Sequence, residues 1–391
     1  MSLRLSDPWL QSPAAQKVMA ALTARGHQAL FVGGCVRNAL LAAPVSDLDI
    51  SISARPEVTT ELAEAAGLKA VPTGFEHGTV TVVADGQGFE VTTFRRDVET
   101  DGRHAQVVFS ERVEEDAARR DFTMNALYAD RTGQVIDPLG GLPDLQARRL
   151  RFIGDAGQRI AEDYLRILRF FRFHAWYADP ELGIDADGLA ACAAGAEGLD
   201  CLAAERVGQE MRKLLAAPDP APSLAAMDHS GVLARILPGA DSKSVAPLVA
   251  FETDNNQSPD PIRRLAALGG EDAAQRFRLS KIEQRHLSQL QDALRQDKSL
   301  GEMAQDFGAE RAWDLALTRA AMIGQPVAPD TETRIARAAS AKFPVKAADL
   351  KGYSGKAIGT RLRQLRSAWI ASDFTLDKSA LLALPSSDGS G

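Results

Sequence analysis

Residues 31–52 read FVGGCVRNALLAAPVSDLDISI, and this stretch decides the fold that we expect. An apolar run ends at the glycine pair Gly33 and Gly34, a short helical segment follows, and a second apolar run begins at residue 48. Apolar runs bounded by glycine and charged residues favour strands, so the order is strand, glycine turn, helix and strand. This order predicts an α+β unit at the start of the chain.

Asp47 and Asp49, two residues apart, lie at the start of the second run, one just before it and one inside it. Side chains alternate across a strand, so both carboxylates are expected on one face, where they repel each other unless a cation lies between them. Oxygen ligands beside a phosphate-bearing substrate suit Mg²⁺. The backbone at Gly33 and Gly34 would let a triphosphate approach the next helix, with Arg37 pairing to phosphate. The alternative is a glycine turn followed by an exposed acidic strand.

The elements outside this stretch divide the chain into two parts. Strands are predicted at residues 29–32, 48–53, 79–84, 89–94 and 106–109, a hairpin at 127–129 and 135–136, and helices at 12–25, 36–41 and 56–66. The second half is rich in Ala, Leu, Arg, Glu and Gln, which favours helices. We therefore predict an α+β head at 1–147 followed by an all-helical C-terminal half, made of a neck at 148–222, a body and tail at 223–384 and a disordered end at 385–391. Linkers are expected at 216–223, 254–261 and 324–330.

Composition excludes several classes of protein. The chain has 391 residues, a net charge of −7 and three cysteines without a CxxC pair, which supports neither a disulfide framework nor a zinc site. No apolar run reaches the roughly 18 residues that a membrane span needs. The N-terminus has no apolar signal-peptide core. We therefore expect a cytoplasmic protein.

Two basic stretches stand out in this acidic chain. Residues 148–172 hold seven arginines, and residues 351–369 hold five basic residues and no acidic one. The second stretch resembles a glycine-started helix that binds RNA phosphates, and the candidate RNA-binding residues in it are Lys351, Lys356, Arg361 and Arg363. The alternative for both stretches is a solvated helix face.

The glycine pair, Arg37 and the DLD triplet together resemble the opening motif of a known family. It is the class II tRNA nucleotidyltransferase (CCA-adding) and bacterial poly(A) polymerase family, within the superfamily that includes DNA polymerase beta. Asn38 stands where the family usually has aspartate. The resemblance implies a polymerase-beta-like mixed sheet with helices and a third carboxylate on a neighbouring strand. Glu90 is the candidate for that carboxylate, although a strand glutamate is more often a solvated residue.

Residues 119–127, RRDFTMNAL, resemble the second motif of the same family. The resemblance implies that Arg120 contacts the nucleotide and that Asp121 and Asn125 shape the ribose and phosphate site. Taken alone, the segment reads equally well as a charged helix start followed by core residues. Between the first two motifs, the charged loop after residue 94 resembles one that helps the family switch from CTP to ATP, and an inert surface connection is the alternative.

Residues 162–173, EDYLRILRFFRF, resemble the motif that selects the incoming base in this family. We expect one continuous helix with Asp163, Arg166 and Arg169 away from the core face. A carboxylate accepts from the amine of cytosine or adenine while a guanidinium donates to the ring nitrogen, so Asp163 and Arg166 are predicted to read the base. Arg169 and Arg172 are predicted to contact phosphate or to support Asp163 and Arg166. Intrahelical ion pairs are the alternative.

Residues 205–215 resemble the next helical motif of the family, and we assign Glu205, Arg206 and Glu210 a structural part in the neck. The predicted function is the addition of CMP and AMP, from CTP and ATP, to the 3′ end of tRNA with Mg²⁺. A poly(A) polymerase and a partial CC- or A-adding enzyme are the near alternatives. The intact DLD argues against a silent RNA-binding protein, and the long helical half argues against an enzyme that modifies small molecules.

Overall fold

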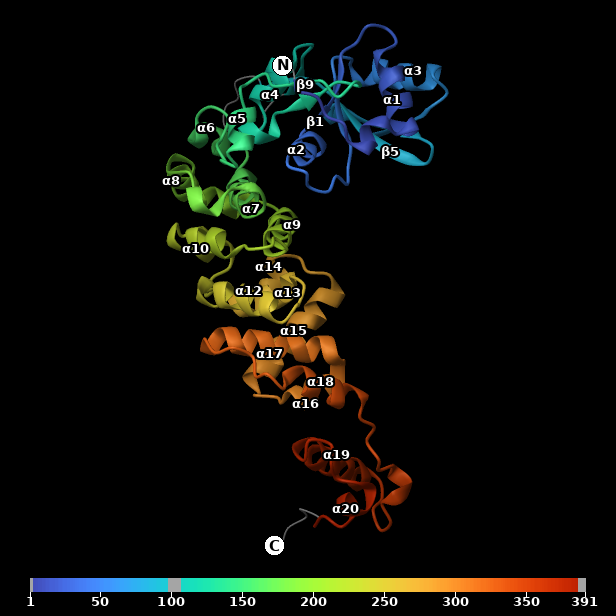
Figure 1. The fold of residues 1–391 in the computed structure, drawn as a ribbon, viewed down its shortest axis with the longest axis vertical. Helices are drawn as coiled ribbons and strands as arrows, with labels where there is room; N and C mark the ends of the chain where they lie inside the picture. Colours follow the sequence, from blue (N-terminus) through green and yellow to red (C-terminus); the bar gives the residue numbers. More distant parts are fainter. Residues whose placement is uncertain (1–2, 98–106, 386–391) are drawn as a thin grey trace. The chain divides into compact units, whose positions relative to one another are not determined.

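The structure is a computed structural model that describes residues 3–97 and 107–385 (Figure 1). Contacts divide the described chain into two compact units, one with Met1–Leu214 and Pro222–Ile236 and the other with Leu215–Ala221 and Leu237–Gly391. The division into head, neck, body and tail stays a prediction. The predicted disordered end, apart from Pro385, and most of the loop predicted to switch nucleotides lie outside the described residues.

A seven-stranded mixed sheet forms the centre of the head, in the order β3-β4-β5-β2-β1-β8-β9. Strands β2 and β5 run parallel, and the other neighbours are antiparallel. Its strands are β1 (Ala29–Val32), β2 (Asp49–Ile52), β3 (Lys69–Gly74), β4 (Thr79–Ala84), β5 (Gln87–Thr93), β8 (Tyr128–Ala129) and β9 (Val135–Ile136). A separate two-stranded sheet pairs β6 (Arg95–Asp97) with β7 (Val107–Phe109). The predicted α+β head is therefore confirmed.

Helices pack against this sheet, and after β9 the described chain contains helices and no further strands. Helices α1 and α3 contact strand β4, and the apolar side chains Val80 and Val82 of β4 and Phe89 of β5 are buried. The helices of the first unit are α1 (Pro13–Thr23), α2 (Gly34–Leu40), α3 (Pro56–Ala65), α4 (Val113–Ala118), α5 (Leu142–Gln146), α6 (Ala156–Glu162), α7 (Leu165–Tyr177), α8 (Ala186–Ala194), α9 (Ala204–Leu215), α10 (Ala221–His229) and α11 (Val232–Ile236), the last residue of α9 and the first of α10 counting with the second unit. Short 3-10 helices lie at Pro8–Gln11, Phe75–His77, Thr123–Asn125, Pro180–Leu182, Ala196–Cys201, Ser242–Ser244 and Ala347–Asp349.

The second unit is helical, as predicted. Its helices are α12 (Val245–Asp254), α13 (Pro261–Leu268), α14 (Ala273–Arg276), α15 (Lys281–Arg295), α16 (Leu300–Phe307), α17 (Ala309–Ile323), α18 (Thr331–Ser340), α19 (Lys356–Ala371) and α20 (Lys378–Leu382). Trp369 of α19 packs between Phe343 and Phe374 in a separate apolar cluster near the end of the chain.

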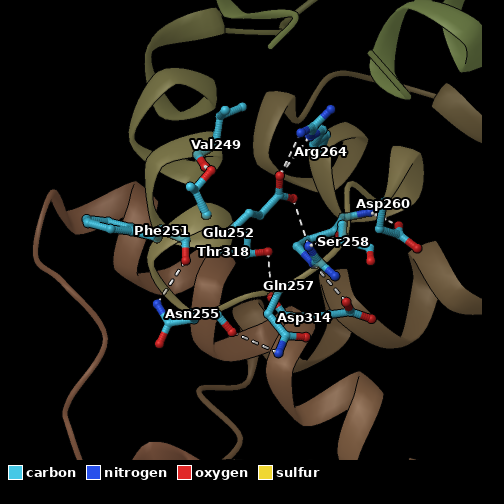
Figure 2. A network of polar contacts seen from close by, with 12 residues as sticks. Val249, Phe251, Glu252, Asn255, Gln257, Ser258, Asp260, Arg264, Asp314 and Thr318 are labelled. Carbon is cyan, nitrogen blue, oxygen red and sulfur yellow. Dashed lines mark hydrogen bonds and ion pairs between the residues drawn. The ribbon is translucent and has the colours of Figure 1, made fainter. Parts of the chain in front are cut away.

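A buried charge network, made of Glu252, Arg263, Arg264, His286 and Asp314, joins four helices of this unit. Arg263 donates to Asp314 at 2.9 Å and to Glu252 at 2.7 Å, and Arg264 donates to the other oxygen of Glu252 at 2.7 Å. Figure 2 shows the carboxylate of Glu252 beside Arg264. His286 completes the network at 2.7 Å from Asp314.

Arg264 also donates to the backbone carbonyl groups of Leu215, Ala217 and Pro218, at 2.6, 2.5 and 3.2 Å. The proline-rich segment predicted as a linker at 216–223 is therefore fixed at its first residues. The linker predicted at 254–261 is wrong as a boundary, because it is a loop inside the second unit. Asp260 caps helix α13 there by accepting from the backbone amide of Arg263 at 2.7 Å.

Among the described residues, no helix combines the length and apolar character that crossing a membrane requires. Cys35, Cys192 and Cys201 are all free thiols.

Candidate active site

Three carboxylates lie around the start of β2. Asp49 is the first residue of the strand, and Asp47 lies in the loop just before it. Both are exposed, with buried Leu48 between them, which is the alternation expected for one shared face. Parallel pairing sets Asp49 directly opposite Glu90 of β5, so the candidate for the third carboxylate lies on the strand next to Asp49, and its role stays a prediction.

The charge around Asp49 is unbalanced. Although Asp49 is exposed, neighbouring protein groups take away part of the solvent around its carboxylate, which raises its pKa; the negative charges of Glu90 and Asp47 raise it further, while Arg120 opposes them. Among the described residues, no three His, Cys, Asp or Glu side chains already converge as metal ligands, and the carboxylate of Asp47 accepts from Ser46 at 3.0 Å. The all-oxygen donor set and the excess negative charge nevertheless fit a hard divalent cation.

The glycine turn brings the first two motifs together. Gly33 has φ 69° and ψ −118°, a conformation that glycine adopts far more readily than other residues, and it begins helix α2. A Cβ atom at Gly33 would lie 3.5 Å from Nη1 of Arg120 and 3.6 Å from Oδ1 of Asn125. The first motif therefore faces two polar side chains of the second, and the absence of a side chain on Gly33 and Gly34 leaves the backbone open to a phosphate group.

Three arginines surround the ring of Phe173 in helix α7. The guanidinium carbon atoms of Arg37, Arg169 and Arg172 lie 5.0, 5.3 and 4.6 Å from the ring centroid. Burial lowers the pKa of Arg37, and the positive charges of Arg172 and Arg169 lower it further, although Tyr177 opposes them. Arg169 and Arg172 are ion-paired with Asp121 and Glu210, whereas the recorded hydrogen bonds of Arg37 go to neutral groups, so Arg37 is the one of the three best suited to face an anion beside the glycine turn.

Asp121 connects the head motif to the neck motif. It accepts hydrogen bonds from Arg169 at 2.7 Å, from the side chain of Asn125 at 3.1 Å and from the backbone amide of Phe122 at 2.9 Å. Burial opposes ionisation, but these donors still hold the pKa of Asp121 at about 2. Asn125 in turn accepts from Arg37 at 2.8 Å. Asp121 therefore orients residues of the site.

Asn38 keeps a contact with Arg37 despite lacking a charge. Its Oδ1 accepts from Nε of Arg37 at 3.1 Å and from Nη2 at 2.9 Å. Its Nδ2 donates to the carbonyl oxygen of Pro44 at 2.7 Å, which ties helix α2 to the loop that leads to Asp47.

The predicted continuous helix over 162–173 is wrong. Helix α6 ends at Glu162, Asp163 has extended backbone angles of φ −155° and ψ 103°, and helix α7 begins at Leu165. The break is stabilised locally, because the carboxylate of Asp163 accepts from the backbone amide of Leu165 at 3.1 Å. Asp163 therefore does not share a helix face with the arginines of α7.

The partners of the two predicted base readers also differ from the expectation. Arg166 of α7 donates to Glu162, the last residue of α6, at 2.5 Å and to the carbonyl group of Arg159 at 2.6 Å, so the ion pair joins two helices instead of lying within one. Asp163 accepts from Arg206 of helix α9 at 2.8 Å. Arg172 of α7 donates to Glu210 at 2.5 Å, so α9 braces α7 through Glu210 and holds the break before α7 through Arg206.

One predicted RNA-binding residue is placed differently. Lys351, Lys356 and Arg363 are exposed. Arg361 is only 6% exposed, and its guanidinium donates to the backbone carbonyl groups of Leu384 and Pro385. Arg361 therefore holds the segment that follows α20 against α19, and its assignment to RNA is corrected.

Sequence reasoning missed the residues that surround Arg120. Asp116 lies 3.1 Å from its Nη2, and the hydroxyl group of Tyr128 accepts from its Nε at 3.0 Å. The spacing of four residues between Asp116 and Arg120 was the available signal.

Comparisons with known proteins agree with this geometry. A family model described as "Poly A polymerase head domain" matches residues 29–151, and one described as "Probable RNA and SrmB- binding site of polymerase A" matches residues 182–244. The CCA tRNA nucleotidyltransferase 1, mitochondrial, of Danio rerio is 32% identical over 378 residues, which cover 90% of this chain and 86% of the relative. The CCA-adding enzyme of Geobacillus thermodenitrificans is 33% identical over 368 residues, covering 90% and 88% of the two chains.

The fold is also similar to solved structures. The CCA-adding enzyme of Bacillus stearothermophilus in complex with CTP superposes with a TM-score of 0.75 at 29% identity, and the match covers 94% of each chain.

Proposed function

The chain belongs to the class II CCA-adding enzyme family of nucleotidyltransferases, and from this premise we propose that it adds CMP and AMP, from CTP and ATP, to the 3′ end of tRNA without a nucleic-acid template. The observation that carries the proposal is the register of Asp49 with Glu90, beside a glycine turn that faces Arg120. Acidic and basic groups thus lie together where a hydroxyl group and a triphosphate would meet.

Nucleotidyltransferases of this kind depend on a divalent cation, and we propose that it is Mg²⁺. Asp47 and Asp49 would hold it, with Glu90 as the neighbouring carboxylate. Such a cation, when bound, lowers the pKa of the terminal hydroxyl group and offsets charge on the leaving pyrophosphate.

The residues of this chain position the triphosphate. Backbone at Gly33 and Gly34 lies against the phosphates, while Arg120 and the arginines around Phe173 offset their negative charge. The 3′ oxygen of the tRNA forms a bond to the α-phosphorus as the bond to the β-phosphate oxygen breaks, and pyrophosphate leaves in line.

We assign the choice of base to Asp163, which would accept the exocyclic amine of cytosine or adenine, with Arg166 as the donor to the ring nitrogen. Within residues 3–97 and 107–385 the structure records no partner for Nε of Arg166, so its guanidinium retains a donor beyond those given to Glu162, Arg159 and Arg119. We assign phosphate contacts with tRNA to Lys351, Lys356 and Arg363 of the basic stretch. The free thiols suit a reducing compartment such as the cytoplasm.

The test is incorporation of labelled nucleotides into three tRNA transcripts, one lacking CCA, one ending in CC and one complete. We expect CMP on the first, a single AMP on the second and none on the third. Continued addition of AMP would instead identify a poly(A) polymerase, and addition on only one of the incomplete substrates would identify a partial enzyme.

Asp49→Asn provides the control, because the amide keeps the shape and removes the charge. We expect the rate to fall about a thousandfold or more while the far-ultraviolet circular dichroism is unchanged. Near-normal turnover by this variant would refute the assignment of Asp49.

A further inference from the structure

Arg120 is held from one side only. Its Nε donates to Tyr128 at 3.0 Å and lies 3.3 Å from Asp116, and its Nη2 donates to Ser51 at 3.2 Å and to Asp116 at 3.1 Å. The structure records no hydrogen bond for Nη1 among the described residues, and this is the nitrogen that faces Gly33. The guanidinium group is thus anchored along one edge and open along the other.

The anchoring groups are also bonded to one another. The hydroxyl group of Tyr128 donates to Asp116 at 2.8 Å, and that of Ser51 lies 3.5 Å from the same carboxylate oxygen. Asp116, Tyr128 and Ser51 are each 1% exposed or less. A carboxylate accepts only, so the direction of every bond is determined: Arg120 donates to the two hydroxyl groups, and both hydroxyl groups donate to Asp116.

The charges agree with this arrangement. Burial opposes ionisation of Asp116, but Arg120, Tyr128 and Arg119 lower its pKa, so the carboxylate remains charged inside the head. Burial raises the pKa of Tyr128, so its hydroxyl group keeps the proton that it donates. A buried ion pair of this kind, with its remaining lone pairs satisfied, holds a fixed geometry.

We propose that Asp116, Tyr128 and Ser51 are positioning residues that fix the plane of Arg120 so that its Nη1 meets the nucleotide phosphates at the Gly33 turn. The proposal rests on the proposed function, because it concerns the same site. It follows from the geometry: with Nε and Nη2 occupied, the guanidinium group cannot rotate about its long axis without breaking bonds in a buried place. Donors that are fixed before the reaction stabilise developing charge without reorganisation.

The experiment is a double-mutant cycle with Tyr128→Phe, which removes one hydroxyl group and keeps the ring. We expect kcat for CMP incorporation to fall about tenfold, because the substitution removes both the bond from Nε of Arg120 and the bond to Asp116, while KM for tRNA is unchanged. In an Arg120→Lys background, which lacks the forked guanidinium, Tyr128→Phe should cause less than a twofold further loss, because its effect passes through Arg120.

Two further variants separate positioning from folding. Asp116→Asn should lower kcat more than Tyr128→Phe, because it removes the charge as well. Thr93→Val is the matched control, because it removes another buried hydroxyl group of the sheet, one that donates to the carbonyl group of Ala54 at 2.8 Å. It should lower the melting temperature in the same way but leave kcat within twofold.

Equal losses from Tyr128→Phe in the wild-type and Arg120→Lys backgrounds would overturn the proposal. The same cycle is measured by CTP binding with calorimetry, which does not require turnover. A wild-type protein that binds CTP without incorporating it would refute the proposed function, and the binding cycle would still decide the role of Tyr128. Additive losses in an active enzyme would refute the positioning role alone.

Discussion

The carboxylate of Asp163 has two partners within the protein itself. Oδ1 accepts from the backbone amide of Leu165, and Oδ2 accepts from Arg206. Each carboxylate oxygen can accept more than one hydrogen bond, so both retain capacity for an amine of the incoming base. Arg206 thereby orients an acceptor-only group, and a base with a carbonyl oxygen at that place would face a second acceptor.

Asp163→Ala should relax the discrimination against UTP. We expect the ratio of kcat/KM for CTP to that for UTP to fall about ten- to a hundredfold on a tRNA lacking CCA, because the acceptor that rejects a carbonyl group is gone. Arg206→Met should lower the ratio less, since the carboxylate remains but loses its orientation.

Arg235→Met is the matched control for Arg206→Met. It breaks another partly exposed ion pair of the first unit, between Arg235 and Asp200 at 2.7 Å, and should leave the ratio unchanged. If Asp163→Ala keeps the CTP preference and only lowers the melting temperature, Asp163 is a helix-break residue and another group selects the base.

The basic side chains of helix α19 fall into two groups, one exposed to solvent and one bonded to the protein itself. Lys356 and Arg363 are exposed, whereas Arg361 is turned inward onto carbonyl oxygens of Leu384 and Pro385. The pattern of basic residues in the sequence is the same for all three. Only the positions on the helix separate a surface for phosphates from a structural clamp.

Replacing both Lys356 and Arg363 by alanine should weaken tRNA binding and flatten its dependence on salt. Two lost phosphate contacts correspond to a decrease of about 1.5 in the slope of log K against log salt concentration. Filter binding of tRNA between low and moderate salt measures the slope, and CTP binding should be unchanged.

Arg361→Ala is the control here, because it should lower the melting temperature and keep the slope. A slope that is unchanged by the double replacement but reduced by Arg361→Ala would contradict the assignment, because it would place the RNA contact at Arg361 and not at the exposed residues Lys356 and Arg363.

At the level of elements, short-range pattern predicted most of the head. Strand β1, strand β4 and the hairpin of β8 and β9 were found from apolar runs between turns. Strand β3 was missed because it contains Pro72 and mostly exposed or half-exposed residues, and it forms as an edge strand by pairing with β4.

The break between α6 and α7 was hidden for a different reason. Local propensity favours a helix through Asp163, but a tertiary contact competes with it. A Cβ atom at Gly198 would lie 2.0 Å from the ring of Tyr164, so the chain after α8 packs against the residue that follows the break. Such a contact joins segments more than 30 residues apart and leaves no periodic signal in either.

For the site, spacing and the family resemblance together predicted Asp47, Asp49 and Gly33 as site residues, and the resemblance alone predicted Glu90. The identity of the partners could not be predicted, because Arg206 and Tyr177 reach Asp163 and Arg37 from other helices. Tertiary packing, rather than sequence spacing, decides which cation faces which carboxylate.

On the scale of the whole molecule, the buried charge network of the second unit is a place where a single substitution should cost much stability. Asp314→Asn would leave Arg263 without one of its two carboxylate partners in a buried place, and we expect the free energy of unfolding to fall by about 3–5 kcal/mol. Asp292→Asn, which breaks an exposed ion pair with Arg295 on α15, should change it by less than about 0.5 kcal/mol. Urea unfolding of both variants measures the difference.

Acid should act on the same network. Burial raises the pKa of Asp314, but His286 and Arg263 outweigh it, so the pKa of Asp314 is lowered. Outside this network, the pKa of Asp121 in the head is also lowered, to about 2. A carboxyl group with a depressed folded pKa contributes stability that is present above its unfolded pKa of about 3.9 and lost as the pH falls through the folded value. The urea midpoint of the wild type should therefore fall between about pH 4 and pH 2, and less steeply in Asp314→Asn.

Arg264 has a consequence for how this gene can diverge. Its guanidinium holds residues 215–218 through carbonyl oxygens, which every amino acid supplies, whereas its bond to Glu252 needs one particular side chain. Residues 215–218 can therefore be substituted during evolution without loss of their hydrogen bonds to Arg264, provided that each new residue permits the same backbone path. Arg264 and Glu252 must be inherited together, so a recombination event between relatives that differ at these two residues is penalised when it falls between 252 and 264.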